Sequence, residues 1–265
     1  MNKLFAIAAS ISILASSAFA WEPEEMNAVI DQTNFIVNRG CSGTLISLEP
    51  PLILTNHHCI DRFVRSVNRD VTDENGKIST VKELKLDPVT VAQVSYSGHE
   101  TVGSSTYVTE IVARQKNRDL AVLQLRAEKV PYTIVSPLLP EGEKTERGER
   151  VWAVGNPAGL DATVTTGIIS SVTRTFQFPW AENEDLPMIQ TDVGIFGGNS
   201  GGALYDTQGR LVGVPAAGHR QATHLGLAIP TSIVWEVLAK NCLAEHVGGT
   251  NNELCNEDEE SETEE

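Results

Sequence analysis

Residues 197–202 form a loop sequence that could present a reactive hydroxyl group. They read Gly-Gly-Asn-Ser-Gly-Gly, so two glycines precede and two glycines follow the dipeptide Asn199-Ser200. Glycine adopts backbone angles that other residues avoid, and this composition therefore favours a tight turn. Such a turn could expose the Ser200 hydroxyl and direct the amides of Gly198 and Ser200 toward a developing oxyanion. Taken alone, a glycine-serine cluster is more typical of an ordinary surface turn.

Two upstream segments contain the side chains that a serine nucleophile needs. A serine hydroxyl is a weak nucleophile at neutral pH, so it requires a base, and an imidazole suits this role. The imidazole in turn needs an acceptor that orients it, usually a buried carboxylate. Residues 55–59 read Thr-Asn-His-His-Cys, and Asp119 precedes an apolar segment at 120–123. Taken alone, the histidine could have only a structural role, and the aspartate could be an ordinary residue at the end of a strand. The occurrence of all three segments in the order histidine, aspartate, serine favours nucleophilic catalysis.

The first 20 residues have the three parts of an export signal. Lys3 supplies the positive charge, residues 4–14 are mostly apolar, and residues 18–20 read Ala-Phe-Ala, a small-x-small cleavage site. The apolar run is shorter than the roughly 20 residues that a membrane-spanning helix needs. We expect cleavage after Ala20 and a mature chain in the periplasm or outside the cell.

The charge of the chain argues against two classes of partner. The 265 residues carry a formal net charge of −15, and seven acidic residues lie within residues 257–265. Nucleic acids and anionic membrane surfaces both attract basic proteins. We therefore expect neither a nucleic-acid partner nor a membrane partner. The acidic segment at 256–265 has the composition of a disordered tail.

The chain has four cysteines, at positions 41, 59, 242 and 255. An even number in an oxidising compartment indicates two disulfides, for which three pairings exist. The pairs Cys41–Cys59 and Cys242–Cys255 close the shortest loops and are favoured. A zinc site built from the first pair and the neighbouring histidines is disfavoured, because adjacent side chains of an extended segment point to opposite faces. We expect no metal and no cofactor.

Short apolar segments separated by turn residues predict two β-rich halves. The expected strands of the first half lie at 35–37, 44–46, 52–54, 89–97, 107–112 and 120–125. Those of the second half lie at 151–154, 163–173 (interrupted at Gly167), 188–191, 204–205, 211–214 and 225–229. Residues 126–148, rich in Pro, Glu and Gly, connect the two halves.

Only one helix is expected, beginning at Thr231, which could cap it. Its apolar face contains Ile233, Val234, Val237 and Leu238. Residues 21–34 are polar and acidic and are interpreted as an arm or lead-in. Residues 68–77 are interpreted as a surface turn within an insertion around 66–85.

Three regions resemble the chymotrypsin-like serine proteases. Residues 41–46 with 54–59 resemble the histidine region of that family, residues 119–123 its aspartate segment, and residues 198–202 its nucleophile loop. Features of the bacterial HtrA (Do-like) branch are Asn199, Gly155-Asn156-Pro157 and residues 165–170, 190–192 and 228–230. The resemblance covers roughly residues 35–240.

The resemblance implies a fold and a set of roles. The fold would be all-β, with two six-stranded antiparallel barrels (about 35–126 and 150–230) and a C-terminal helix at 231–241, together forming a peptidase domain at 21–240. His58, the last residue of the family's Thr-x-x-His unit, would be the base, Asp119 the orienting carboxylate and Ser200 the nucleophile. The amides of Gly198 and Ser200 would form the oxyanion hole. A disulfide beside His58 is more typical of animal chymotrypsins than of HtrA proteases.

Two parts of the family pattern are not expected here. Residues 241–265 are interpreted as a disulfide-pinned loop and an acidic tail, with no PDZ-type domain and hence no regulation through one. No Ile-Val-Gly-Gly start is found, which argues against activation by a newly cleaved N-terminus.

The resemblance assigns the walls of the substrate pocket to Gly194 and Ile195 and to the strand 214–218, with Val214, Pro215 and Ala216 as the main candidates. Because Gly194 offers no carboxylate, a preference for Lys or Arg is not expected, and a small or medium apolar residue fits better.

Three other polar residues near this segment receive simpler interpretations. His219 and His224 could make a polar pocket, but exposed loop histidines are the favoured interpretation. Asp192 is interpreted as a hydrogen-bonding residue that supports the fold.

The most consistent interpretation is an exported serine endopeptidase that acts on peptides or proteins through an acyl-enzyme. One alternative is a catalytically silent protein with a protease fold that binds peptides. The other is an esterase, although esterases with this triad usually place serine first in the chain.

Overall fold

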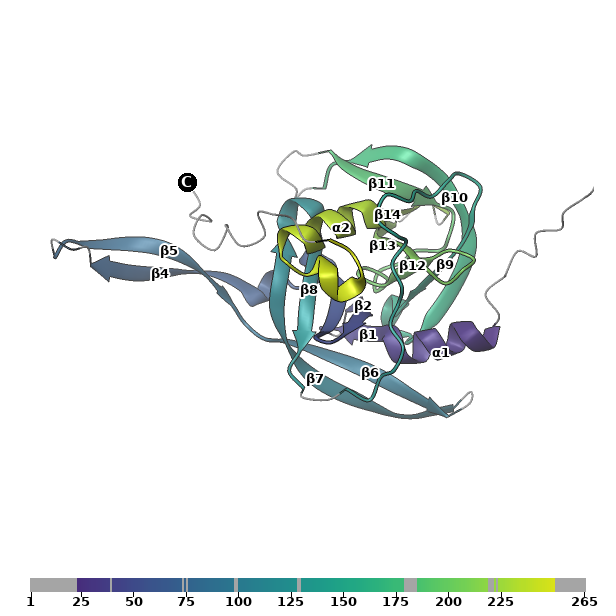
Figure 1. Ribbon diagram of the computed structural model, residues 1–265, viewed down its shortest axis with the longest axis horizontal. Coiled ribbons are helices and arrows are strands. Elements are labelled where there is room, and N and C mark those ends of the chain that lie inside the picture. The colour runs from purple at the N-terminus through teal and green to yellow at the C-terminus, as the bar shows by residue number, and fades with distance from the viewer. Residues whose placement is uncertain are drawn as a thin grey trace, which may run out of the picture.

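Two closed β-barrels make up most of the chain (Figure 1). The computed structural model describes residues 23–250, apart from residues 39, 73, 75, 98–99, 128–129, 179–184, 219–221 and 223. The predicted export signal, its cleavage site and the acidic tail lie outside the described residues. Among the described helices, none has the length and apolar character that crossing a membrane would require.

The first barrel closes in the strand order β1-β2-β3-β8-β7-β6. Its strands are β1 (Asn34–Val37), β2 (Cys41–Leu48), β3 (Pro51–Thr55), β6 (Val89–Ser97), β7 (Glu100–Gln115) and β8 (Leu120–Leu125). Apolar side chains alternate inward, and Phe35, Leu45, Ile53 and Leu123 are completely buried inside the barrel. Burial of such side chains removes apolar surface from water and stabilises the closed sheet.

The second barrel closes in the order β10-β11-β14-β13-β12-β9. Its strands are β9 (Arg150–Gly155), β10 (Thr163–Phe176), β11 (Leu186–Thr191), β12 (Ala203–Tyr205), β13 (Leu211–Gly218) and β14 (Gly226–Pro230). Its interior holds Val151, Ile169, Ile189 and Leu204, among others. The prediction of an all-β fold with two six-stranded antiparallel barrels and a C-terminal helix is confirmed.

Strand β10 is longer and more regular than the sequence suggests. It runs through Gly167 without a break, and its register shifts later, between Ile169 and Arg174. Gly167 is required by a close approach, since a Cβ atom there would lie 2.2 Å from Oδ1 of Asp192. The same Asp192 oxygen accepts a hydrogen bond from the backbone N–H of Ile168 at 2.7 Å, as its expected supporting role requires.

The helices depart from the sequence expectation in two ways. Residues Pro23–Thr33 form a helix, α1, where an arm or lead-in and no helix was expected. Packing of Ile30 accounts for this helix, because the Ile30 side chain is 3 % exposed and belongs to the core that the two barrels share. The predicted C-terminal helix is present as α2 (Thr231–Lys240), but Thr231 does not cap it. Its hydroxyl donates instead to the carbonyl of Leu211 at 2.8 Å.

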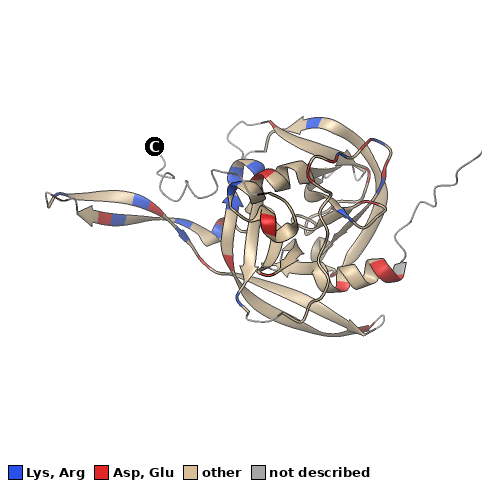
Figure 2. Cartoon of the chain, viewed as in Figure 1, with Lys and Arg blue, Asp and Glu red and all other residues tan. Residues whose placement is uncertain are grey.

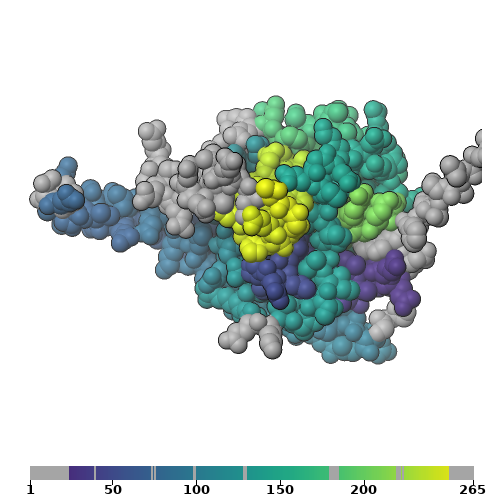
Figure 3. Space-filling view, in the orientation of Figure 1, coloured from purple at the N-terminus to yellow at the C-terminus, as the bar shows by residue number. Residues whose placement is uncertain are grey.

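A long hairpin projects from the first barrel (Figure 3). Its strands, β4 (Val64–Thr72) and β5 (Ile78–Leu86), pair only with each other within the described part of the chain. Almost all of its side chains are exposed. The sequence predicted an insertion here but not its regular strands, because polar residues on both faces hide the alternation that marks a strand.

Candidate active site

His58 and Asp119 meet at the end of the first barrel. Asp119 follows the short helix η3 (Lys116–Arg118), has a left-handed backbone conformation and is fully buried. Its carboxylate oxygens lie 2.8 and 3.0 Å from Nδ1 of His58. One of them also accepts the backbone N–H of His58 at 2.9 Å. The carboxylate therefore holds both the backbone and the ring of His58, and this leaves Nε2 as the ring nitrogen for chemistry.

The turn around Asp119 is held by a neighbouring amide side chain. Asn56 is fully buried and donates from Nδ2 to the backbone carbonyl of Asp119 at 2.9 Å. This bond ties the residue before η1 (His57–Cys59) to the end of η3. The two segments that carry His58 and Asp119 are thus fastened at two points.

His57 lies in a different environment from His58. It is 2 % exposed, and its Nε2 has no hydrogen-bond partner among the described residues. Burial lowers the pKa of His57 from its ordinary value of 6.5. Asp61 and Asp119 oppose this shift, whereas Arg114 and Lys116 add to it. The carboxylate of Asp119, by contrast, hydrogen-bonds the ring of His58.

Ser200 lies in the loop between β11 and β12 and is tied to the first barrel through its backbone. Its carbonyl accepts the N–H of Ser42 at 2.8 Å. The same carbonyl is 3.7 Å from Sγ of Cys59, the residue after His58. A ring nitrogen of His58 lies within 4.8 Å of that sulfur atom. The loop that carries Ser200 is thereby brought next to the segment that carries His58.

Ser42 acts as the link between the barrels, a role that the sequence did not reveal. Its hydroxyl donates to the carbonyl of Gly198 at 2.7 Å and accepts the N–H of Asn156 at 2.8 Å. Asn156 also donates from Nδ2 to the Phe35 carbonyl at 2.9 Å. Both Ser42 and Asn156 stand within the motifs that carried the family resemblance, but spacing alone does not show that distant motifs touch.

The residues before Ser200 form a turn that suits an oxyanion hole. The N–H of Asn199 donates to the carbonyl of Phe196 at 3.0 Å, and Gly198 has a φ of 110°. A positive φ at the third position identifies a type II turn. Within the described residues, the amides of Gly198 and Ser200 donate no hydrogen bond. Two unused amides two residues apart in the nucleophile loop are what binding of an oxyanion requires.

Two glycines of this loop, Gly198 and Gly201, are sterically required. A Cβ atom on Gly198 would lie 2.3 Å from the carbonyl oxygen of Asn156, and one on Gly201 would lie 2.3 Å from that of Ser42. Both residues also have φ values between 80° and 110°, which side chains other than glycine rarely adopt. The loop is therefore wedged between the barrels with no room for a larger residue.

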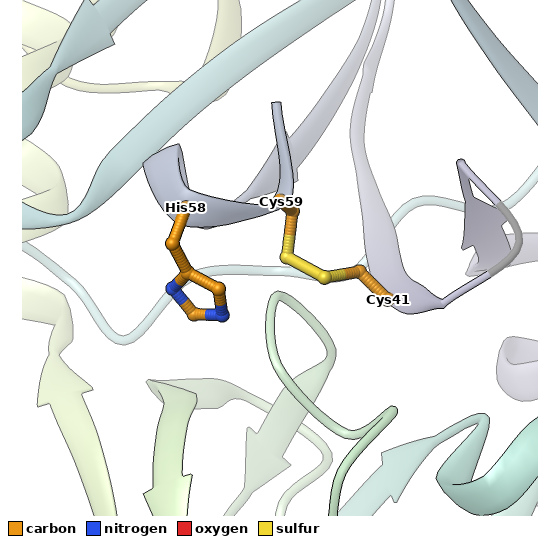
Figure 4. A group of neighbouring side chains, drawn as sticks. All are labelled: Cys41, His58 and Cys59. Atoms are coloured by element: carbon orange, nitrogen blue, oxygen red, sulfur yellow. A yellow bond between two sulfur atoms is a disulfide. The ribbon is translucent and has the colours of Figure 1, made fainter. Parts of the chain in front are cut away.

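The disulfide between Cys41 and Cys59 is present and lies beside His58 (Figure 4). This confirms the first predicted pair. The second, Cys242 with Cys255, lies outside the described residues because Cys255 does. The sulfur atoms of Cys41 and Cys59 lie within 4.8 Å of a ring nitrogen of His58. Since both sulfurs are in a disulfide, they are not the thiolates that zinc binds, and this group is not a metal site.

The predicted pocket residues fall into two groups. Ala216 lies next to the nucleophile, and its carbonyl is 3.4 Å from Oγ of Ser200. The carbonyl of its neighbour Pro215 accepts the N–H of Gly201 at 3.0 Å. Val214, by contrast, is fully buried in the core. The backbone of the Pro215 and Ala216 segment therefore borders the site, whereas the Val214 side chain packs away from solvent.

Ile195 lies over the paired strands β13 and β14 of the second barrel. A Cβ atom on Gly226 would lie 2.6 Å from Cδ1 of Ile195, and one on Gly218 would lie 2.2 Å from its carbonyl oxygen. Gly194, the other predicted wall, is half-buried beneath the Phe196 ring. The sequence placed Gly218 in the same pocket wall as Ile195 but did not identify Gly226 as a neighbour, and His219 lies outside the described residues.

Comparisons with known proteins agree with this geometry. A family model described as a trypsin-like peptidase domain matches residues 41–214. The chain belongs to the trypsin-like peptidase family. Among similar proteins is a DegP-like periplasmic serine endoprotease of Chlamydia trachomatis, 32 % identical over 171 residues, which cover 63 % of this chain and 32 % of that protein. Another is serine protease HTRA1 of Xenopus laevis, 34 % identical over 185 residues, which cover 68 % and 39 %.

The solved structures to which the chain is similar include an HtrA-type protease, AlgW, with a tripeptide. It superimposes with a TM-score of 0.59 at 27 % identity, over 82 % of this chain and 63 % of that one. The resemblance to HtrA proteases is therefore confirmed. The chain spans between 26 % and 39 % of the length of the curated relatives named HhoB and HTRA1, so these relatives contain much that it does not match.

Proposed function

We propose that this trypsin-like peptidase is a serine endopeptidase in which Ser200, His58 and Asp119 form the catalytic triad. The observation that carries the proposal is the buried Asp119 carboxylate at 2.8 Å from Nδ1 of His58, beside the loop that holds Ser200. A buried carboxylate in this position fixes the tautomer of the imidazole and stabilises the imidazolium that forms during proton transfer.

The reaction then proceeds in two stages. Nε2 of His58 removes the proton of the Ser200 hydroxyl as Oγ attacks the substrate carbonyl, and the amides of Gly198 and Ser200 stabilise the oxyanion. The tetrahedral intermediate collapses as His58 gives this proton to the leaving amine, which leaves an acyl group on Oγ. A water molecule, deprotonated by His58, attacks the acyl group, and Ser200 recovers its proton as the carboxylic acid departs. The serine hydroxyl, now 3.4 Å from the Ala216 carbonyl, must turn toward His58 before the first step.

We further propose that peptides or proteins are the substrates and that a small apolar side chain enters the pocket beside the nucleophile. Ile195 fills the space over Gly226 and carries no charge, so a long basic side chain would find neither room nor a partner. Gly194, Ile195, Pro215 and Ala216 remain the proposed walls. Export to the periplasm or beyond is part of the same proposal, supported by the signal-like residues 1–20 and by the periplasmic relatives.

Labelling with a fluorophosphonate probe tests the nucleophile. The mature protein should react covalently at Ser200, and the Ser200→Ala variant should not. Retained labelling in that variant, or no labelling of the wild type, would reject the assignment. A peptide-cleavage assay run beside an ester-hydrolysis assay tests the two alternatives, since an esterase would hydrolyse esters alone and a silent binding protein would hydrolyse neither substrate.

The two adjacent histidines provide a matched pair for testing the base. His58→Ala should lower kcat/KM for a peptide by about 10⁴-fold or more, as loss of a triad member does. His57→Ala should leave a measurable rate, because the His57 ring does not hydrogen-bond the carboxylate. The opposite result would transfer the role of base to His57.

A further inference from the structure

Asn156 lies directly behind the turn that carries the proposed oxyanion hole. It follows β9, precedes the short helix η4 (Pro157–Gly159) and is 3 % exposed. A Cβ atom on Gly198 would lie 2.3 Å from the carbonyl oxygen of Asn156, so no space separates the two backbones. Asn156 takes no part in the proton transfers of the proposed reaction, yet it is built into the back of the site.

The Asn156 side chain ties the loop at 156–162 to the first barrel. Its Nδ2 donates to the carbonyl of Phe35 and to Oγ of Ser42, each at 2.9 Å. Its Oδ1 accepts Nδ2 of Asn34 at 2.9 Å and the N–H of Ala162 at 3.1 Å. The first three partners belong to β1 and β2, and the fourth closes the loop itself. One amide side chain therefore fixes both the position and the shape of this loop.

Asn156 also decides where the Ser42 hydroxyl points. A hydroxyl group has one hydrogen to donate and two lone pairs that accept. The backbone N–H and the side-chain Nδ2 of Asn156 both donate to Oγ of Ser42, at 2.8 and 2.9 Å. With both lone pairs occupied, the hydroxyl hydrogen is left for the carbonyl of Gly198, which lies 2.7 Å away. Asn156 thus makes Ser42 a donor to the Gly198 carbonyl.

A second contact fixes the peptide group that contains the N–H of Gly198. The carbonyl of Gly197 accepts the N–H of Ala158, the second residue after Asn156, at 2.9 Å. Because a trans peptide group is planar, its C=O and N–H point in opposite directions. A Gly197 carbonyl held by Ala158 therefore turns the N–H of Gly198 away from η4. The peptide groups on both sides of Gly198 are held, one by Ala158 and the other by Ser42.

The groups of this network are neutral and buried. Strands β1 and β2 contain no charged residue, and β9 contains only Arg150, at the end far from Asn156 (Figure 2). Salt screens interactions between charges, so it should leave these bonds unchanged. The network therefore acts on the geometry of the turn and adds no charge near His58.

We propose that Asn156 is a positioning residue for the oxyanion hole, which orients the N–H of Gly198 through Ser42 and Ala158. This inference rests on the proposed function, because the orientation matters only if an oxyanion forms there. Without the Asn156 side chain, the Ser42 hydroxyl is free to turn elsewhere and the loop that presents Ala158 is loosened. The loss should appear in the transition state, where the charge on the oxygen develops, and not in the binding of the substrate.

Peptide-cleavage kinetics test this role. Asn156→Ala should lower kcat by about 10²-fold, as loss of one oxyanion-hole donor does, with KM within about threefold of the wild-type value. The acid limb of the pH profile of kcat/KM should not move, because the contact between His58 and Asp119 is untouched. An unchanged kcat, a loss that lies in KM instead, or a shifted acid limb would overturn the inference.

A peptide boronic acid separates positioning from general destabilisation. One oxygen of its tetrahedral adduct on Ser200 occupies the oxyanion hole, so its affinity for the Asn156→Ala variant should fall in parallel with kcat/KM. The same peptide ending in a carboxamide forms no adduct and should bind the wild type and the variant equally. Equal affinity of the boronic acid for both proteins would contradict the positioning role.

Tyr96→Phe is the matched control. The Tyr96 hydroxyl donates to the carboxylate of Asp161, which is another bond between the first barrel and the same loop. Within the described residues, this hydroxyl makes no hydrogen bond to Ser42 or Ala158. The kcat of Tyr96→Phe should therefore stay within about twofold of the wild-type value. A loss equal to that of Asn156→Ala would show that any weakening of the loop suffices, and the specific role of Asn156 would be rejected.

Ser42→Ala tests the same relay, including the case in which Asn156→Ala does not fold. It removes the hydroxyl that Asn156 directs, and kcat should fall by about tenfold or more because the Gly198 carbonyl loses its donor. The double variant should lose no more than Asn156→Ala alone, since both substitutions act on the same peptide group. An unchanged kcat in Ser42→Ala, or additive losses in the double variant, would overturn the relay.

Failure of this inference is distinct from failure of the proposed function. A wild type that neither cleaves peptides nor reacts with a fluorophosphonate would reject the function, and the inference with it. A wild type that does both, beside Asn156→Ala and Ser42→Ala variants with unchanged kcat, would reject only the role of Asn156.

Discussion

The loop around Ser200 and the β4–β5 hairpin are both connections between strands, yet they differ in almost every physical respect. The nucleophile loop is wedged between the barrels, and a Cβ atom on Gly198, Gly201 or Gly202 would meet a backbone oxygen at 2.3 Å. The hairpin extends into solvent with nearly every side chain exposed. The first connection depends on both barrels being in place, whereas the second touches little beyond itself.

This difference separates residues that position the chemistry from residues that only extend the surface. In the nucleophile loop, hydrogen bonds run from Ser42 in one barrel to Gly198 and Asn156 in the other. In the hairpin, the close contacts are surface pairs such as Arg65 with Asp87, at 2.6 Å. Loss of a contact that positions the site should therefore have larger consequences than loss of a contact at the surface.

The largest contrast is between two aspartates that both make short contacts. Asp119→Asn should reduce kcat/KM by about 10⁴-fold, because the amide favours the wrong tautomer of His58. Asp87→Asn breaks an exposed, solvent-screened ion pair, so it should hardly change the free energy of unfolding and should leave activity unaffected. Peptide-cleavage kinetics and denaturant unfolding measure both. Similar losses in the two variants would remove the distinction.

Two glycines provide the next contrast. Gly201→Ala should destabilise the protein by about 3 kcal/mol and abolish measurable cleavage, because the new Cβ would overlap Ser42 and Thr55 and the φ of 82° is strained. Gly103→Ala, in β7, should be tolerated, since no atom lies within 4 Å of the added carbon. Thermal or denaturant unfolding measures the stability of both variants, and a peptide-cleavage assay measures their activity. A stable, active Gly201→Ala variant would contradict the tight fit of the loop.

A smaller effect is expected from the pH dependence of stability. Burial holds the pKa of His57 below 6.5, so below pH 6.5 the unfolded chain binds a proton that the folded chain does not. Stability is therefore complete above this pH and falls as the pH decreases toward the folded pKa, by at most about 1.4 kcal/mol per pH unit. His57→Gln should flatten this part of the curve, and substitution of the exposed His246 should not. An unchanged slope in His57→Gln would mean that His57 does not titrate in this way.

The smallest effect should follow from shortening the hairpin. Joining Ser66 to Leu84 through an Asn-Gly turn removes most of β4 and β5. A two-stranded ribbon without a covering layer contributes little stability. Activity should stay within about twofold of the wild type and the melting temperature should hardly move. A large decrease in the activity or in the melting temperature would show that the hairpin supports the barrels.

Much of the fold could be predicted because the barrel strands carry clear local signals. Apolar and polar residues alternate in segment 89–97, and apolar residues are clustered in segment 120–125. Each of these segments forms a strand close to its expected position. Helix α1 was missed because its sequence is polar apart from a few residues such as Ile30, whose burial depends on the shared core. The hairpin strands were missed because neither face is buried.

In the site, too, features carried by short motifs could be predicted, whereas contacts between distant parts of the chain could not. The contact between His58 and Asp119 was anticipated from family motifs, and the disulfide from cysteine spacing. The linking role of Ser42 was not, since it depends on the register of two barrels that the sequence does not specify. Val214 was placed in the pocket wall by position along the strand, but its side chain faces the core.

The central claim is that the two barrels together bring the imidazole of His58 into proton-transfer contact with the hydroxyl of Ser200. A crystal structure of the mature protein with a peptide boronic acid on Ser200 would measure the distance between Nε2 of His58 and Oγ of Ser200 directly. The account predicts a hydrogen-bonding distance, about 2.6–3.2 Å. A His58 ring turned away from Ser200, or a separation that neither a direct hydrogen bond nor one intervening water could span, would contradict it.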